Sequence, residues 1–90
     1  VRYFQTGEEI FISSLSKIEL LGKKDLSNRE IAKIQEFLET LSIIDVDSYI
    51  AEKAAKLRRR GVQIGDAIIA ATAWHLGIPL LTHDHGFLKN

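Results

Sequence analysis

Three carboxylates stand at positions where a folded chain could use them for chemistry. Asp66 opens a nearly all-apolar segment over residues 66–76, and a helix that is apolar on every side is expected to be buried, Ile69 included. Asp84 comes just after the last apolar run of the chain. Glu19 lies shortly after the first apolar run. Asp66 falls on the same helical stripe as Ile69, and a carboxylate in such surroundings needs a partner, for example a metal cation. The three acids are therefore candidate site residues.

Oxygen ligands of this kind suit hard divalent cations. Mg²⁺ and Mn²⁺ prefer carboxylate and water oxygens, and Mg²⁺ usually takes only one or two protein carboxylates. Glu19, Asp66 and Asp84 suffice for one site if the fold brings them together. A metal held there lowers the pKa of bound water, orients a phosphodiester and neutralises charge on its oxygens. The chemistry that these acids predict is phosphodiester hydrolysis.

Each acid also has a purely structural interpretation. Glu19 can complete a capping box with Ser16, or it can pair with Lys23 four residues later. Asp66 is a good N-cap residue, and Asp84 fits ordinary turn chemistry. A chain in which all three acids only cap and turn would be a plain α/β scaffold. Convergence of the acids on one point separates the two interpretations.

Other polar groups offer weaker alternatives. His83 and His85 flank Asp84, and a pair of imidazoles can bind Zn, Ni or Cu. Histidines in a turn, however, are more often exposed to solvent and bind no metal. The basic residues 23–24 and 58–60 could follow the phosphates of a nucleic acid. The basic triplet is equally well explained by the negative end of a helix.

The elements that must position these groups alternate between strands and helices. Capping signals occur at Ser16 with Glu19, at Ser27 with Glu30 and at Asp47. The expected helices are a short one from Ser16 to Gly22, where it stops, followed by residues 28–41, 47–61 and 66–76. Gly77 ends the last of them. The expected strands are residues 10–12, 42–46 and 80–82.

This order predicts an α/β fold, with a parallel sheet between two helical layers. Sites in such sheets gather beyond the carboxyl ends of the strands, where Thr82 and Asp84 lie by sequence. The 90 residues predict a single domain over residues 1–90, and Lys plus Arg balance Asp plus Glu at 12 each. The absence of cysteine, of a membrane span and of a signal-peptide pattern favours a cytoplasmic protein.

Three motifs resemble those of the PIN-domain family of ribonucleases, and within it the VapC-type toxins of toxin–antitoxin modules. Residues 12–22 resemble the family's strand-to-helix segment, in which a Ser or Thr stands three residues before an acid that Leu follows. Residues 66–73 resemble its Asp-led, Ala-rich helix, and residues 79–84 resemble its last acidic motif. The resemblance covers nearly all of the chain in the right order.

The resemblance implies a metal-dependent endoribonuclease that cleaves RNA. It implies that Glu19, Asp66 and Asp84 are the catalytic, metal-binding acids, with Ser16 and Thr82 as supporting groups. The implied cofactor is Mg²⁺ or Mn²⁺. The implied partners are an RNA substrate, an antitoxin protein and further copies of the chain.

The sequence departs from the family's pattern at both ends. The chain begins at Val1 without methionine, just before the family's second strand, so the family's first strand and its acid are expected to be absent, as is its last strand. The family's first strand is central, and its loss predicts a gap that another segment or a second copy must fill. Gly86 also stands where the family often has a further acid. The alternative is therefore a truncated, inactive PIN-like domain that acts as a binding or oligomerisation module; activity is expected where the missing N-terminal segment is present.

Overall fold

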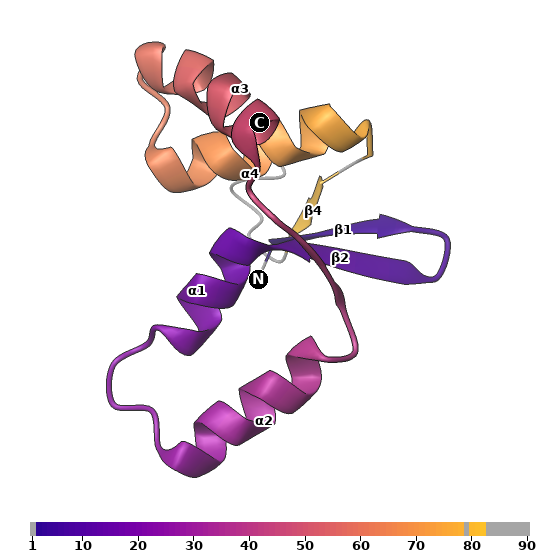
Figure 1. Ribbon diagram of the computed structural model, residues 1–90, viewed down its shortest axis with the longest axis vertical. Coiled ribbons are helices and arrows are strands. Elements are labelled where there is room, and N and C mark those ends of the chain that lie inside the picture. Colours follow the sequence, from indigo (N-terminus) through magenta and orange to yellow (C-terminus); the bar gives the residue numbers. More distant parts are fainter. Residues whose placement is uncertain (1, 79, 83–90) are drawn as a thin grey trace.

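The computed structural model describes residues 2–78 and 80–82 as a sheet between helices (Figure 1). The elements in chain order are β1 (Arg2–Thr6), β2 (Glu9–Ser13), α1 (Ser14–Leu21), α2 (Asn28–Leu38), β3 (Ser42–Ile44), α3 (Ser48–Arg59), α4 (Ile64–Leu76) and β4 (Leu80–Thr82). In Figure 1, α3 and α4 lie above the sheet and α1 and α2 below it. This arrangement confirms the predicted α/β class with two helical layers.

The sheet has the strand order β3-β2-β1-β4. β2 and β3 pair in parallel, with Ile12 opposite Ile43. β1 runs antiparallel to both of its neighbours, so β2, β3 and β4 share one direction. The three strands that the sequence predicts are present and run the same way. The sheet as a whole is mixed, however, because β1 opposes them.

The strand β1 corrects the prediction of a central gap that another segment or a second copy must fill. It forms a hairpin with β2, and the two-residue turn starts at Gly7, where φ is +59°. Tight hairpin turns need such a positive φ, which glycine adopts without strain. Phe4 is fully buried, and its backbone pairs with Phe11 on one side and Leu80 on the other. The chain's own residues thus satisfy the backbone groups at the sheet centre.

The helices α3 and α4 pack side by side and form a core cluster between them. This cluster contains Ile50, Ala54, Ala67 and Ala71, with Ile44, Val46, Leu57, Val62 and Ile68 packed against it. Ile69 is fully buried, as predicted, whereas Ile64 and Trp74 are 63% and 61% exposed. The expectation that α4 is buried on every side is therefore wrong, because its small, buried residues occupy only part of the helix surface.

Several helix ends follow their local sequence signals. Ser27 and Glu30 form the predicted capping box of α2, and the side chain of Asp47 accepts a hydrogen bond from the backbone N–H of Ile50 at the start of α3. Gly77 ends α4 in the left-handed conformation, with φ of 67°. These local contacts fix where the helices begin and end.

Two predicted caps are wrong. The side-chain oxygen of Ser13 caps α1 by accepting from the backbone N–H of Leu15, because β2 runs directly into the helix. Ser16 therefore lies inside α1. The helix α4 begins at Ile64, so Asp66 lies within its first turn and is not its N-cap.

Candidate active site

Two of the three candidate acids, Glu19 and Asp66, meet at one cationic side chain. Asp66 Oδ1 lies 2.6 Å from Arg2 Nη1, and Glu19 Oε2 lies 3.8 Å from Arg2 Nη2. Glu19 comes from α1, and Asp66 comes from the first turn of α4. The fold thus brings together two acids that are far apart in the sequence, with a guanidinium between them.

Arg2 reaches these acids because β1 is antiparallel to its neighbours. The backbone of Arg2 pairs with that of Thr82, the last residue of β4, so the first residue of β1 lies at the edge where β4 ends. The Arg2 side chain is 17% exposed, whereas those of Glu19 and Asp66 are 54% and 51% exposed. The positive group is therefore mostly covered, while its two partners remain half in solvent.

The guanidinium of Arg2 packs against the first turn of α4, beside Gly65. A Cβ on Gly65 would lie 3.7 Å from Arg2 Nη2, which is ordinary van der Waals contact. The amino end of a helix carries partial positive charge and disfavours a cation nearby. The charge-assisted hydrogen bond that Arg2 donates to Asp66 offsets that repulsion. Asp66 therefore holds Arg2 where the helix alone would repel it.

Ser16 lies one helical turn before Glu19 in α1. It is 2% exposed, and its Oγ has no hydrogen-bond partner among the described residues. Ser16 and Glu19 line one surface hollow with Leu20 and Lys23. The two structural interpretations of Glu19 are not seen, because Ser16 is not a cap and the ion pair that Glu19 forms in the described region is with Arg2.

The remaining candidates lie at the end of β4. Thr82 is the last residue of that strand, at the same edge as Arg2. Asp84, His83 and His85 lie outside the described residues. Within residues 2–78 and 80–82, no group of three or more His, Cys, Asp or Glu side chains is placed to hold a metal ion. The site as described is a pair of carboxylates, and the contribution of Asp84 stays a prediction.

The donor atoms at this edge fit a hard divalent cation. Glu19 and Asp66 present half-exposed carboxylate oxygens to one positive group, and one or two carboxylates commonly hold Mg²⁺. The guanidinium of Arg2 contacts one oxygen of each, Glu19 Oε2 and Asp66 Oδ1. A metal ion at this point must therefore compete with Arg2 for the acids.

Sequence reasoning did not identify Arg2 as a site residue. The turn at Gly7, flanked by Phe4 and Ile10, is a hairpin signal that could have placed Arg2 near the end of β2. Its pairing with β4 joins residues at opposite ends of the chain, and no local pattern reports such a contact.

None of the helices in the part of the chain that the structure describes is long and apolar enough to span a membrane.

Comparison with known families agrees with this architecture. Residues 2–90 match the PIN domain family, whose fold is typically that of a nuclease. No curated protein and no solved structure matched the chain. The family match includes both Glu19 and Asp66 and covers nearly the whole sequence, and the chain therefore belongs to the PIN domain family.

Proposed function

We propose that this chain is part of a metal-dependent endoribonuclease, a VapC-like toxin of a toxin–antitoxin module, that hydrolyses phosphodiester bonds in RNA. The observation that carries the proposal is the meeting of Glu19 and Asp66 at one positive charge, in a chain of the PIN domain family. The family supports the reaction class, and the two carboxylates supply the metal ligands that this reaction needs.

The proposed roles follow from the chemistry of the side chains. Glu19, Asp66 and Asp84 hold Mg²⁺ or Mn²⁺, and Ser16 and Thr82 are supporting groups beside them. When bound, the metal supplies a water of lowered pKa and positive charge beside the phosphodiester oxygens. The chain itself positions two of the acids, because α1, which carries Glu19, continues directly from β2, and α4, which carries Asp66, is anchored by its buried side.

The same proposal includes the partners and the location of the protein. The edge of the sheet where Glu19 and Asp66 contact Arg2 is called the acidic edge here. We infer an RNA substrate, an antitoxin that covers the acidic edge, self-association and a cytoplasmic location. Ile18, Phe37 and Ile64 are large apolar residues with 67%, 52% and 63% of their surface exposed, which supports contacts with other chains.

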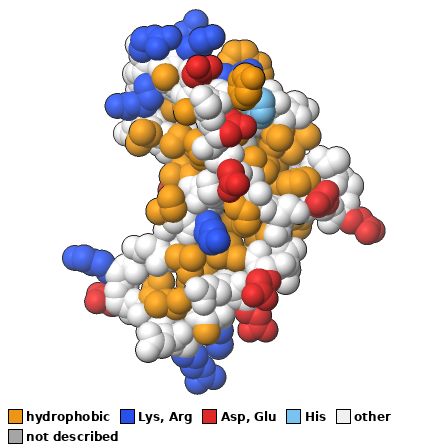
Figure 2. Space-filling model, viewed as in Figure 1, with side chains coloured by type: hydrophobic (Ala, Val, Ile, Leu, Met, Phe, Trp, Pro, Cys, Tyr) orange, Lys and Arg blue, Asp and Glu red, His pale blue; other side chains and the backbone are white. Residues whose placement is uncertain are grey.

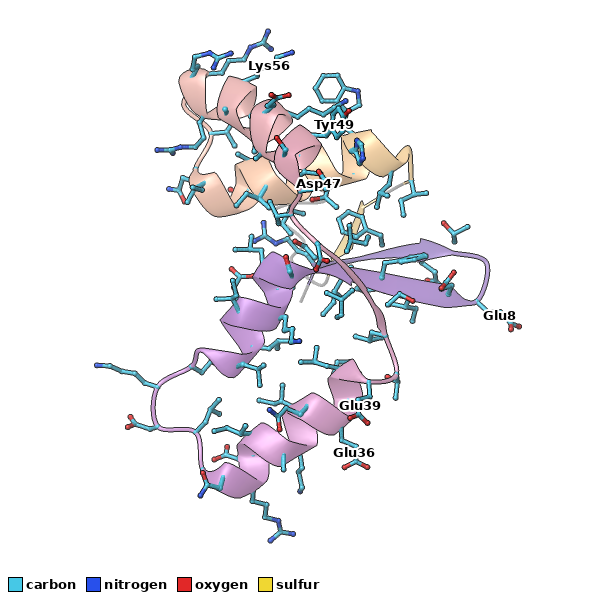
Figure 3. All side chains as sticks on the ribbon, viewed as in Figure 1. Glu8, Glu36, Glu39, Asp47, Tyr49 and Lys56 are labelled. Carbon is cyan, nitrogen blue, oxygen red and sulfur yellow. The ribbon has the colours of Figure 1, made fainter. Side chains whose placement is uncertain are left out.

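Cleavage of a fluorescein-labelled single-stranded RNA tests the proposed reaction. The wild-type protein that includes the segment preceding Val1, with the family's first strand and acid, should cut it with Mn²⁺ or Mg²⁺ and not with EDTA. Residues 1–90 alone should cut it weakly or not at all, because one metal ligand is missing. Asp66→Asn removes the charge of a ligand at nearly constant volume and should slow cleavage about 100-fold or more. Glu36→Gln is the matched control, because Glu36 is exposed on α2 (Figure 3), a helix that contributes no residue to the contacts of Arg2 with Glu19 and Asp66. Equal rates for wild type and Asp66→Asn would refute the proposed role of Asp66.

A second candidate function is that of an inactive binding or oligomerisation module. The contact of Arg2 with both acids favours it, because the carboxylates already have an internal cation. In that case neither the wild-type protein that includes the segment preceding Val1 nor its Arg2→Ala variant should cut RNA with Mn²⁺, and calorimetry should detect no Mn²⁺ binding to either protein.

A further inference from the structure

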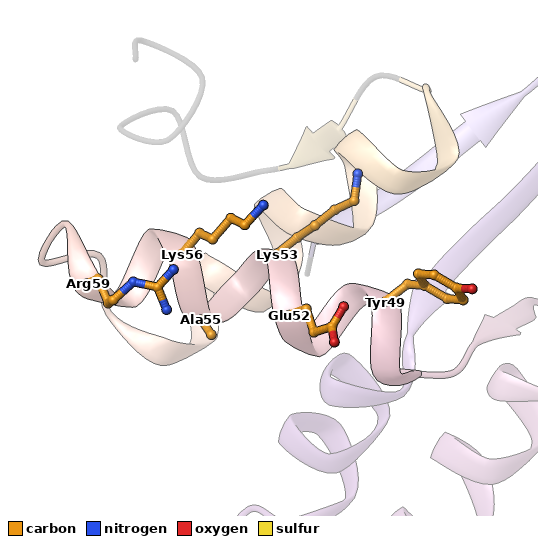
Figure 4. A pocket seen from close by; sticks show the side chains of 6 residues that line it. All are labelled: Tyr49, Glu52, Lys53, Ala55, Lys56 and Arg59. Atoms are coloured by element: carbon orange, nitrogen blue, oxygen red, sulfur yellow. The ribbon is translucent and has the colours of Figure 1, made fainter.

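A row of cations lies on the outer side of α3. Lys53, Lys56 and Arg59 follow one another at three-residue intervals and line a hollow of about 360 Å³ with Tyr49, Glu52 and Ala55 (Figure 4). Lys56 points away from the sheet in Figure 3, and Figure 2 shows Lys and Arg side chains gathered over this end of the molecule. Lys56 and Arg59 are exposed to solvent, and Lys53 is half-buried.

Aromatic rings from two helices flank this row. Trp74 of α4 is 61% exposed, and Lys53 Nζ lies 4.1 Å from the centroid of its ring. Tyr49 is 68% exposed and stacks on His75, with ring centroids 6.0 Å apart and planes 11° apart. The α3 face is defined here as Tyr49, Lys53, Lys56 and Arg59 of α3 with Trp74 and His75 of α4. It presents exposed ring surfaces beside positive charges.

The charges of the α3 face are not neutralised within the part of the chain that the structure describes. No ion pair there involves Lys53, Lys56 or Arg59, although Glu52 shares their hollow. The negative end of α3 accounts for cations in its last turn, which holds Lys56 and Arg59. It accounts neither for Lys53 in the middle of the helix nor for the exposed rings.

We propose that the α3 face binds single-stranded RNA, with phosphates on Lys56 and Arg59 and a base stacked at Trp74. Grooves that combine cations with exposed aromatic rings bind single strands in this way, because every base has a flat face. The inference rests on the proposed function for its choice of nucleic acid. It adds a binding surface that is separate from the acidic edge.

The α3 face and the acidic edge are joined by α4. The contacts of Tyr49 with His75 and of Lys53 with Trp74 place the start of α3 beside the end of α4. Asp66 lies eight residues before Trp74, which corresponds to about 12 Å along the helix axis. A strand held at Trp74 therefore needs only a few nucleotides to reach Asp66.

Binding can be measured without cleavage. The full chain is titrated in EDTA with a fluorescein-labelled 12-nucleotide oligouridine, and fluorescence anisotropy reports the complex. Trp74 is the only tryptophan in the chain, so quenching of its own fluorescence by unlabelled oligouridine reports stacking at that residue. Anisotropy should rise and tryptophan emission should fall over the same concentration range. A rise in anisotropy without quenching would overturn the stacking at Trp74.

Two variants locate the contacts. Lys56→Ala with Arg59→Ala should weaken binding and lower the slope of log affinity against log salt by about 1.4, since each phosphate contact with a single strand contributes about 0.7. Trp74→Leu should weaken binding about tenfold with little change in that slope. Circular dichroism confirms that each variant is folded. A salt slope unchanged in the double variant would overturn the phosphate contacts.

A charge-matched variant provides the control. Arg29→Ala with Lys33→Ala removes two exposed cations from α2 and should leave the affinity within about twofold of wild type. Equal losses in the two double variants, or binding to phosphatidylserine vesicles without binding to RNA, would overturn the proposal. Because EDTA excludes metal, loss of cleavage with retained RNA binding contradicts the proposed function alone, and cleavage without binding at the α3 face contradicts this inference alone.

Discussion

Arg2 and the cations of the α3 face carry the same charge in opposite settings. The Arg2 side chain is 17% exposed and contacts two carboxylates, whereas Lys56 and Arg59 are exposed and form no ion pair in the described region. The charge at the sheet edge is thus balanced within the chain, and the charge on α3 is left for an external anion. Cations that form no ion pair within the described part of the chain, such as Lys56 and Arg59, therefore indicate where an anionic partner can bind.

The largest expected effect concerns the strand that places Arg2. Phe4→Ala should lower the free energy of unfolding by about 3–5 kcal/mol, because Phe4 is fully buried in the central strand β1. Urea denaturation followed by circular dichroism measures this change. Phe37→Ala, at a position that is 52% exposed on α2, is the control and should change stability by less than about 1 kcal/mol. Similar losses in the two variants would mean that β1 is not a central strand.

A smaller effect is expected from removing the internal cation. Arg2→Ala should tighten Mn²⁺ binding about fivefold, the upper end of what a half-exposed ion pair contributes. The stability should change little, because Asp66 remains in the favourable first turn of α4. Isothermal titration calorimetry measures the affinity, with Arg29→Ala as a charge-matched control. Unchanged or weaker Mn²⁺ binding in Arg2→Ala would show that guanidinium and metal do not compete.

An effect of similar size is expected on α2, which lies outside both cationic regions and serves as a reference. Ser27→Ala should lower stability by about 1 kcal/mol at neutral pH, because it removes one half of the capping box. The hydrogen bond from the Ser27 backbone, followed by that from its side chain, lowers the pKa of Glu30. A lowered pKa in the folded state stabilises the protein above the ordinary value of 4.5, and this contribution is lost as the pH falls through the lowered value.

Thermal unfolding of wild type and Glu30→Gln across the acidic range checks this sign. The difference in melting temperature should be constant near neutral pH and should shrink as the pH falls below 4.5. A difference that grows on acidification would contradict the capping interaction.

Local signals predicted the helices well and the centre of the sheet poorly. Ser27 with Glu30, Asp47 and Gly77 act on backbone groups within a few residues, so their sequence pattern is sufficient to locate helix ends. Ser16 misled the prediction for α1, because Ser13 is equally suited to capping and lies where β2 ends. Such errors shift a boundary without changing the fold.

The candidate site depends on long-range pairing. The sequence predicted that Glu19, Asp66 and Asp84 converge on a divalent metal ion, which stays a prediction. It could not predict that Arg2 contacts two of these acids. That contact requires β1 to be antiparallel and to pair with Thr82, which follows from the hairpin turn at Gly7 and from the docking of β4. The part of the site that rests on Asp84 lies outside the described residues and stays a prediction.

The pairing of β1 with two different neighbours also has a consequence for the order of folding. Thr6 pairs with Glu9 across a tight turn, whereas Arg2 pairs with Thr82 across almost the whole chain. Closing a short loop loses less chain entropy than closing a long one, so the hairpin forms early and β4 joins late. Transient detachment of β4 should therefore precede global unfolding and open the sheet beside Arg2. The acidic edge would then be the last part of the molecule to assemble and the first to come apart.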